Sequence, residues 1–342
     1  MASRMDNLTH TLTAVAISQT GLNRKTRFAT LTLILGANAP DLDLVAGLKD
    51  GAAYLKYHRG ITHSFLGIVV FAIIIWGVVY EVGKRVRPKP NLSLNAAWLL
   101  LAALLGTASH LLLDFTNSYG VRPFLPFSAR WYAWDIMFIV DPLLLILLTL
   151  GLGVPWLLRL VSEEVGARKS RLTRGAIFSL CALAALWGLR DFAHRRALSI
   201  LDSRTYADEN PQRLGAFPSP INPFVWTGVV ETEAFLHVLR VNALDPNSPP
   251  EEVGTFNKPE ASPALEAAGK TRTGRIFMDV ARFPWGHVGE SEDGFLVSLR
   301  DLRYYTGPAQ SRNFVADIEL DKNLRSRSES FRFTAPLRPG ED

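Results

Sequence analysis

Four short clusters of histidine and acidic residues stand next to long apolar segments of this 342-residue chain. They are NLTH at 7–10, PDLD at 40–43, HRGITH at 58–63 and HLLLD at 110–114. Ionisable side chains beside membrane-spanning segments are costly, so they are candidates for function. Imidazole and carboxylate groups without thiols suit Zn²⁺, Mn²⁺ or Fe²⁺ better than Cu⁺ or an iron–sulfur cluster. The four clusters together therefore predict a divalent metal site.

The spacing within the clusters supports this prediction. His110 and Asp114 are four residues apart, which places both on one face of a helix. Pro40 ends the preceding helix and puts Asp41 and Asp43 in a turn. Each cluster alone also fits a structural role, as a helix-start histidine, a capped turn or a hydrogen-bonded pair. It is their joint position beside one membrane face that favours a metal.

The predicted ligands exceed the four that one structural zinc ion needs. We therefore expect Zn²⁺, with Mn²⁺ or Fe²⁺ as alternatives, and two ions or more sharing a carboxylate. The predicted ligand set is His10, Asp41, Asp43, His58, His63, His110 and Asp114. Asp43, His58 and Arg59 are the predicted catalytic residues. Arg59 would bind a substrate phosphate in a bidentate manner, or else cap a helix or bind a lipid headgroup.

Apolar segments surround these clusters. Four of them predict membrane-spanning helices: Phe65–Tyr80, Ala96–Leu113, Ile136–Leu158 and Ala176–Leu189. A bilayer core of roughly 30 Å needs about 20 apolar residues, and shorter segments are tolerated at some cost. Two weaker segments, Leu8–Thr20 and Phe28–Asn38, predict a helical hairpin within the bundle. The alternative for each segment is a buried helix in a large soluble core.

Basic loops predict the orientation of these helices. Lysine and arginine cluster in three connections, at 24–27, 84–89 and 168–174. If each segment crosses once, the three connections share one side, which the positive-inside rule makes the cytoplasm. All the predicted ligands and the C-terminal domain then lie on the extracytoplasmic side of the inner membrane.

The composition changes after Ala197. Residues 1–197 carry a net charge of +10 and residues 198–342 a net charge of −5, so the excess of basic residues belongs to the apolar half and no nucleic acid partner is expected. Alternating runs predict strands at Val225–Val230, Ala234–Val241, Arg275–Val280, Gly294–Arg303 and Asn313–Leu320, with a loop at Asp245–Ser262. We therefore predict two domains. Residues 1–197 form a helical transmembrane domain with the metal site, and 198–342 form an extracytoplasmic, β-rich domain.

In order along the chain, the motifs MDNLTHTLTA, GANAPDLD, YHRGITHS and SHLLLDFTNSYG resemble the bacterial inner-membrane metal-dependent hydrolases of the YdjM type. The resemblance covers residues 5–145, and NPFVW, ARFPWG and VSLRDLRYY resemble the extracytoplasmic domain of longer members. It implies a distant relationship to helical zinc phospholipases C and related nucleases, hence a phosphoester substrate. It also implies that the seven predicted ligands hold the metal.

The predicted function is therefore hydrolysis of a phosphoester or lipid-like substrate by metal-activated water at the membrane. Membrane lipids and a small-molecule or lipid phosphoester are the expected partners, and the oligomeric state stays open. The alternative is a non-catalytic transporter or scaffold that binds the same ion. A transporter is expected to show polar residues deep in several spans, and Phe65–Tyr80 has none.

Overall fold

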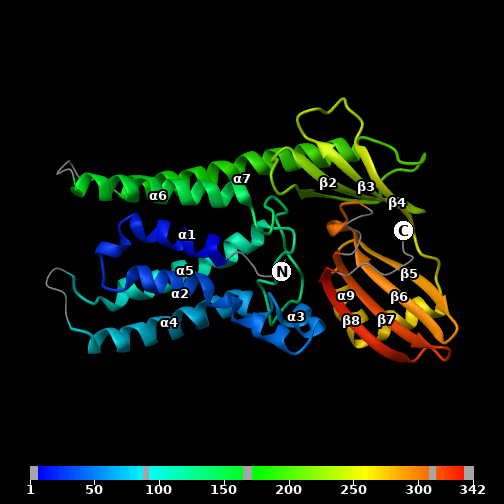
Figure 1. The fold of residues 1–342 in the computed structure, drawn as a ribbon, viewed down its shortest axis with the longest axis horizontal. Coiled ribbons are helices and arrows are strands. Elements are labelled where there is room, and N and C mark those ends of the chain that lie inside the picture. Colours follow the sequence, from blue (N-terminus) through cyan, green and yellow to red (C-terminus); the bar gives the residue numbers. More distant parts are fainter. Residues whose placement is uncertain (1–6, 88–91, 165–171, 308–312, 335–342) are drawn as a thin grey trace. The chain divides into compact units, whose positions relative to one another are not determined.

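The computed structural model describes residues 7–87, 92–164, 172–307 and 313–334 (Figure 1). These residues form two compact units, each of which combines separate parts of the chain. The helical unit contains Arg4–Asp43 and Arg59–Asp191, and the β unit contains Leu44–His58 and Phe192–Asp342. The predicted boundary at residue 197 stays a prediction, and the units differ from it in placing Leu44–His58 with the C-terminal part.

The helical unit is built from α1 (Asn7–Gln19), α2 (Ala29–Asn38), α4 (Phe65–Arg85), α5 (Ala96–Thr116), α6 (Pro142–Glu164) and the first part of α7 (Leu172–Asp202). Short 3₁₀ turns lie at η1 (Leu22–Arg24), η2 (Pro40–Leu48) and η3 (Ile61–His63). In the described residues, α4, α5, α7 and residues Pro142–Leu160 of α6 are long and apolar enough to cross a membrane. The four predicted spans are therefore confirmed as helices.

One helix boundary differs from the prediction, and another agrees with it. The helix expected from Ile136 begins only at Pro142, because Asp141 caps it by accepting a hydrogen bond of 3.1 Å from Leu144 N–H. The end of the second segment agrees with the prediction, because α2 ends at Asn38 and the 3₁₀ turn η2, which starts at Pro40, contains Asp41 and Asp43. Pro40 is compatible with this because a proline is tolerated at the first position of a helix.

Small residues bring α2 and α5 close together. A Cβ atom on Gly106 of α5 would lie 2.6 Å from the backbone oxygen of Leu33 in α2. Gly67 has a similar role at the start of α4, where a Cβ atom would lie 2.1 Å from the oxygen of Ile61. Small residues allow such close backbone approach between membrane helices. The ends of α2, α5 and η3 therefore meet at one end of the helical unit.

The β unit contains two antiparallel sheets, each with its strands in sequence order. The first comprises β1 (Arg213–Pro218), β2 (Val225–Glu231), β3 (Phe235–Asn242) and β4 (Glu251–Asn257). The second comprises β5 (Pro284–Ser291), β6 (Gly294–Asp301), β7 (Asn313–Asp321) and β8 (Ser326–Thr334), and η4 (Leu302–Tyr304) follows β6. Val229 lies opposite Val238 in the first sheet, and Val297 lies opposite Ile318 in the second. The predicted helical membrane part and β-rich part are both confirmed.

The two faces of the first sheet are both buried. On one face Trp226 packs among Ala197 and Leu201 of α7, and on the other Val238 packs among Phe283 and Leu302. The second sheet is accompanied by α8 (Pro263–Lys270) and α9 (Arg272–Val280), and α9 in turn contacts α3 (Gly51–Tyr57). These contacts explain why Leu44–His58 belongs to the β unit.

Two expectations for this part of the chain were wrong. Residues 275–280 form the end of α9 rather than a strand, because Thr271 caps a helix whose buried residues include Thr273, Phe277 and Val280 at helical spacing. The predicted loop at Asp245–Ser262 contains β4, which lies at the edge of the first sheet and, among the described strands, pairs with β3. An edge strand keeps one side toward solvent and so tolerates the polar residues that suggested a loop.

Candidate metal centre

The site begins at the end of α5, where both side chains of the predicted pair are buried. His110 is 0% exposed and Asp114 is 1% exposed. Nδ1 of His110 lies 2.7 Å from the carbonyl oxygen of Ala37, at the end of α2. A carbonyl only accepts, so Nδ1 carries the proton and Nε2 presents its lone pair. The close packing of α2 on α5 thus fixes the tautomer that a metal ligand needs.

Asp41 and His63 complete a group of four. Nε2 of His63 lies 3.0 Å from Nε2 of His110, 3.2 Å from Oδ2 of Asp114 and 3.5 Å from Oδ1 of Asp41. Nε2 of His110 lies 3.4 Å from Oδ2 of Asp114 and 3.6 Å from Oδ1 of Asp41. All four side chains are buried, and their ligand atoms lie within 4.8 Å of one another. Three segments that are distant in the sequence therefore converge on one point.

These separations fit a tetrahedral ion. Ligands that lie about 2.0–2.1 Å from a tetrahedral zinc are separated from each other by about 3.3 Å. Five of the six separations between the donor atoms run from 3.0 to 3.6 Å, and all six are within 4.8 Å. Two imidazole nitrogens and two carboxylate oxygens are also a donor set that divalent zinc, manganese and iron accept. The residues present therefore fit a divalent ion.

Asp43 lies behind His63 in this arrangement. Its Oδ2 atom is 3.2 Å from Nδ1 of His63 and accepts hydrogen bonds from Thr62 Oγ1 at 2.6 Å and from Arg59 N–H at 3.0 Å. Burial lowers the pKa of His63, but hydrogen bonds to Asp114, Asp41 and Asp43 outweigh burial and raise that pKa to about 10. In the absence of an ion, a proton therefore occupies this ring. Asp43 contacts the nitrogen of His63 that faces away from the other donors.

His10, at the start of α1, lies beside the group of four. Its ring stacks on His110 with centroids 4.1 Å apart, and its Nε2 is 3.5 Å from Oδ1 of Asp114. Its Nδ1 is buried and makes no hydrogen bond with the residues that the structure describes. A cavity of about 30 Å³ is lined by His10, Asp114 and Asp141 among others, which is enough space for one water molecule.

Arg59 is fully buried and holds the backbone and side chain of the α5 terminus. Its Nη2 donates to Oδ1 of Asp114 at 3.0 Å, and its Nη1 lies 2.8 Å from Oδ1 of Asn117 and 2.9 Å from the oxygen of Gly120. Nη1 and Nη2 of Arg59 both donate to protein oxygens, and its predicted contact with a substrate phosphate stays a prediction. In this structure Arg59 positions Asp114.

His58 belongs to the β unit, where it directly follows α3. It is 1% exposed, and its ring lies 4.7 Å from the ring of Tyr54. Its predicted roles as a ligand and as a catalytic residue stay predictions. Among the described residues of the helical unit, one group of metal-ligating type is formed, the four residues above. The second ion and the part of Asp43 as a direct ligand also stay predictions.

The sequence interpretation missed three groups that orient the site. Thr62, Asn117 and the carbonyl of Ala37 each bond a predicted ligand or Arg59. Thr62 and Asn117 lie inside the quoted motifs, directly before His63 and three residues after Asp114. Their position inside these motifs could have indicated that they orient the site. The role of the Ala37 carbonyl depends only on how α2 packs against α5, so no side-chain pattern could reveal it.

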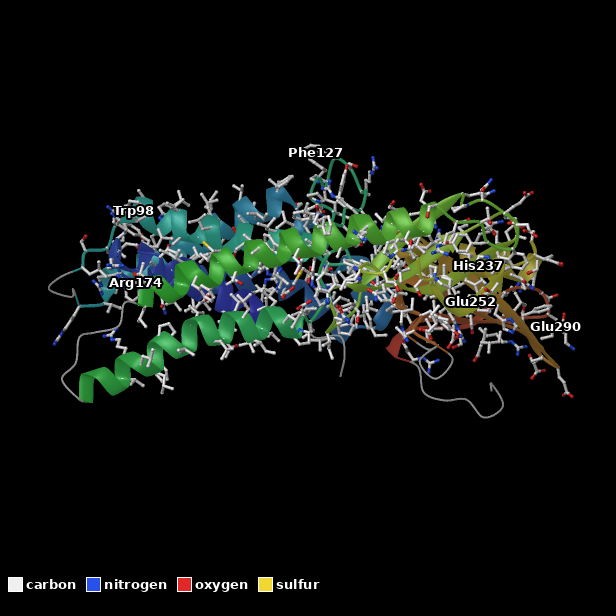
Figure 2. All side chains as sticks on the ribbon, turned by 90° about the horizontal axis from the view of Figure 1, so that it is seen from above. Trp98, Phe127, Arg174, His237, Glu252 and Glu290 are labelled. Atoms are coloured by element: carbon white, nitrogen blue, oxygen red, sulfur yellow. The ribbon has the colours of Figure 1, made fainter. Side chains whose placement is uncertain are left out.

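Basic residues gather at the opposite end of the helical unit. Arg24 donates to Oγ1 of Thr173 at 2.6 Å, Arg27 donates to the oxygen of Arg87 at 3.0 Å, and the ammonium of Lys25 lies 5.3 Å from the ring centre of Trp98. Figure 2 shows Trp98 and Arg174 toward the same end of the helices. Four predicted basic residues lie outside the described residues: Lys89, Arg168, Lys169 and Arg171. The observed contacts place the described basic connections away from the candidate centre.

Comparison with known proteins gives a family and one curated relative. The family described as YdjM inner membrane protein matches residues 5–197, a range that contains every predicted ligand. An uncharacterized protein of Bacillus subtilis (strain 168), YfhP, is 33% identical over 136 residues, which are 40% of this chain and 38% of that protein. The match thus spans about two-fifths of the length of that relative. No solved structure matches the chain.

Proposed function

This chain belongs to the YdjM inner membrane protein family, and we propose that it is a membrane-bound, metal-dependent hydrolase acting on a phosphoester or lipid-like substrate. One observation carries the proposal. Asp41, His63, His110 and Asp114 bring four buried donor atoms to the mutual separations of metal ligands. Buried groups of this kind are costly in a membrane protein unless they have a function.

The four residues would hold one divalent ion, with Zn²⁺ as the first expectation and Mn²⁺ or Fe²⁺ as alternatives. Such an ion, when bound, lowers the pKa of a coordinated water to near 7 and so supplies a nucleophile at neutral pH. The phosphoester class follows from the donor chemistry and from the family resemblance stated above. A second ion would need ligands in addition to these four.

Other residues of the chain would orient this centre. Asp43 and Thr62 direct Nε2 of His63 toward the other donors by engaging its Nδ1 atom. Arg59 holds one oxygen of Asp114, which leaves the other oxygen toward His63 and His110. Groups that orient ligands in this way typically change metal affinity or activity by roughly 10–100-fold.

His10 is the residue placed to accept a proton. Within the described part of the chain its buried Nδ1 atom makes no hydrogen bond, and the ring lines the water-sized cavity next to Asp114. A water in that cavity would lie beside both His10 and Asp114, one of the four candidate ligands. We therefore assign His10 the role of general base, within one water of the reacting atoms.

The position of the site favours an enzyme over a transporter. The four residues lie at or beyond helix ends, in η2, η3 and the last turns of α5, whereas transport sites lie near the middle of the membrane. We also propose that the site and the C-terminal domain are extracytoplasmic, since the described basic connections lie at the other end of the helices. A scaffold that binds the ion without chemistry is the remaining alternative.

The test is metal analysis of the purified full-length protein, together with a screen of phosphomonoesters, phosphodiesters and phospholipids. Asp41→Asn keeps the size of the side chain and removes one charged donor, so it is expected to lose most of the bound metal and all hydrolysis. Asp293→Asn is the matched control, because Asp293 lies exposed in the turn between β5 and β6.

Three outcomes separate the alternatives. If Asp41→Asn loses both bound metal and hydrolysis while Asp293→Asn retains both, the result supports the enzyme. If the protein binds metal stoichiometrically but hydrolyses no compound of the screen, the result supports the scaffold. A wild-type protein that binds no divalent ion contradicts both and reduces the cluster to a buried hydrogen-bond network.

A further inference from the structure

The segment between α5 and α6 carries exposed aromatic side chains at its tip, which we define as residues 123–130. Backbone hydrogen bonds of 2.8 and 2.9 Å between Val121 and Tyr132 close the segment below the tip. Phe127 is 91% exposed and Phe124 is 46% exposed. Figure 2 shows Phe127 at the outer edge of its loop, away from the helices of its unit. Such exposure of phenylalanine marks an interaction surface when it joins a larger apolar patch.

The tip joins the apolar surface of α4. Phe65 N–H, at the first residue of α4, donates to the oxygen of Pro123 at 2.9 Å, and the rings of Phe65 and Phe124 lie edge to face at 5.5 Å. From Phe65 an exposed apolar stripe continues along α4 through Leu66, Val69, Val70, Ile73, Ile74 and Val78. Because α4 is long and apolar enough to span a membrane, this stripe is the face that lipid covers. The tip extends that face beyond the helix.

Basic and aromatic residues surround the apolar tip. The guanidinium of Arg130 lies 5.4 Å from the ring centre of Tyr132, and that of Arg122 lies 4.5 Å from the ring centre of Trp131. No acidic residue occurs between Arg122 and Arg130. Tyrosine and tryptophan are enriched where the bilayer meets water, and arginine there reaches the lipid phosphates. The charge and the ring composition therefore both match the headgroup layer.

We propose that residues 123–130 insert into the interfacial layer of the lipid bilayer, with Phe127 as the deepest side chain and Arg130 at the level of the lipid phosphates. The occupant of this surface is the bilayer itself, since the surface is continuous with the lipid-covered face of α4. The base of the same segment holds the site, through the contacts of Asn117 and Gly120 with Arg59. Resting on the proposed function, this places the metal centre next to lipid headgroups and favours a lipid phosphoester as substrate.

The insertion can be measured without any enzymatic activity. The full-length protein, with Cys181→Ser to remove its one cysteine, is reconstituted in bilayers of phosphatidylethanolamine and phosphatidylglycerol. A nitroxide label is placed at Phe127→Cys, and its collision rates with oxygen and with a water-soluble nickel chelate are compared. Val70→Cys, on the exposed face of α4, serves as the lipid reference, and Glu290→Cys, in β5, as the aqueous reference.

Insertion predicts that the Phe127 label collides more with oxygen than with the nickel chelate, as the Val70 label does. It also predicts a shallower label when Arg130→Gln is added or when phosphatidylglycerol is left out. A label that behaves like Glu290 overturns the proposal, because the tip would then lie in water. A label protected from both reagents also overturns it, because a protein surface, such as a second copy of this chain, would then cover the tip. Each result is independent of whether the protein hydrolyses a phosphoester.

Discussion

The Nε2 atoms of His63 and His110 lie 3.0 Å apart, although the two residues are 47 positions apart in the sequence. In each ring the other nitrogen is already engaged, by Asp43 and Thr62 in one case and by Ala37 in the other. Two ring lone pairs directed at each other repel unless a cation or a proton lies between them. With the carboxylates of Asp41 and Asp114 beside them, the two histidines form a site that requires positive charge.

This requirement predicts a pH dependence for the metal-free protein. Hydrogen bonds to three carboxylates, which outweigh the opposing effect of burial, raise the pKa of His63 from 6.5 to about 10. A raised pKa in the folded state means that the protonated ring stabilises the fold fully below about pH 6.5 and progressively less up to about pH 10. We expect the free energy of unfolding of the metal-free protein to fall over this interval.

Denaturant unfolding of chelator-treated protein at several pH values measures this slope, and His63→Gln is expected to flatten it. Metal binding has to displace the same proton, so affinity for Zn²⁺ is expected to increase with pH across the interval. An affinity that is independent of pH between 6.5 and 10 would contradict the assignment of His63 as a ligand.

Replacement of Arg59 tests its role in holding Asp114. Arg59→Met leaves the carboxylate of Asp114 buried without its cation, which is expected to cost about 3–5 kcal/mol of unfolding free energy. Metal affinity is expected to fall roughly 10–100-fold, because Asp114 loses its orientation. Thermal unfolding and metal titration of the purified protein measure the two effects.

Arg130→Met is the matched control for this variant, because Arg130 is exposed and contacts no residue of the candidate centre. It is expected to leave stability and metal affinity unchanged. If Arg59→Met also left both unchanged, Asp114 would not depend on Arg59.

The orientation in the membrane is tested with reporter fusions. A reporter after Asp342 is expected to behave as extracytoplasmic, and one inserted at Arg87 as cytoplasmic, because the described basic connections share one end of the helical unit. Paired reporters active on one side only, such as an alkaline phosphatase and a fluorescent protein, give the assignment. Cytoplasmic activity at Asp342 would reverse the orientation and place the metal centre on the other side.

Gly51 tests the contact between α3 and the second sheet. A Cβ atom at Gly51 would lie 2.4 Å from the backbone oxygen of Phe331 in β8, so Gly51→Ala is expected to destabilise the β unit by about 1–3 kcal/mol. Gly269→Ala is the control, because no described atom beyond its chain neighbours and its own helix backbone lies within 4 Å of its Cβ position. That helical position is expected to gain about 0.4–1 kcal/mol instead. Denaturant unfolding of the full-length variants compares the two, and equal stabilities would mean that α3 does not depend on this contact.

Several features of this protein could be predicted from the sequence because they depend on neighbouring residues. The apolar segments that form α4, α5, α6 and α7 are longer and more apolar than a helix of a soluble protein needs to be. Hydropathy can be read from consecutive residues, so these segments are visible in the sequence alone. The pairing of His110 with Asp114 follows from the helical period alone. The cap of α6 follows from the order of Asp141 and Pro142.

Other features depend on contacts between distant segments, which local patterns do not encode. The segment 275–280 is short enough to fit either a strand or a helix. It forms the end of α9 because Thr271 caps the helix and Phe277 is buried. The placement of Leu44–His58 in the β unit depends on packing of α3 against α9 and β8. No pattern within 44–58 specifies those partners.

The order of residues along the chain specifies which ligand types are available for a metal site and that they stand beside apolar helices. That Asp41, His63, His110 and Asp114 share one point while Arg59 holds Asp114 depends on the tertiary fold, because close packing brings these segments together. Because Gly106 has no side chain, α2 can approach α5 closely, and because Gly67 has none, the turn before α4 can fold back onto the helix. These close approaches exist only in the folded chain.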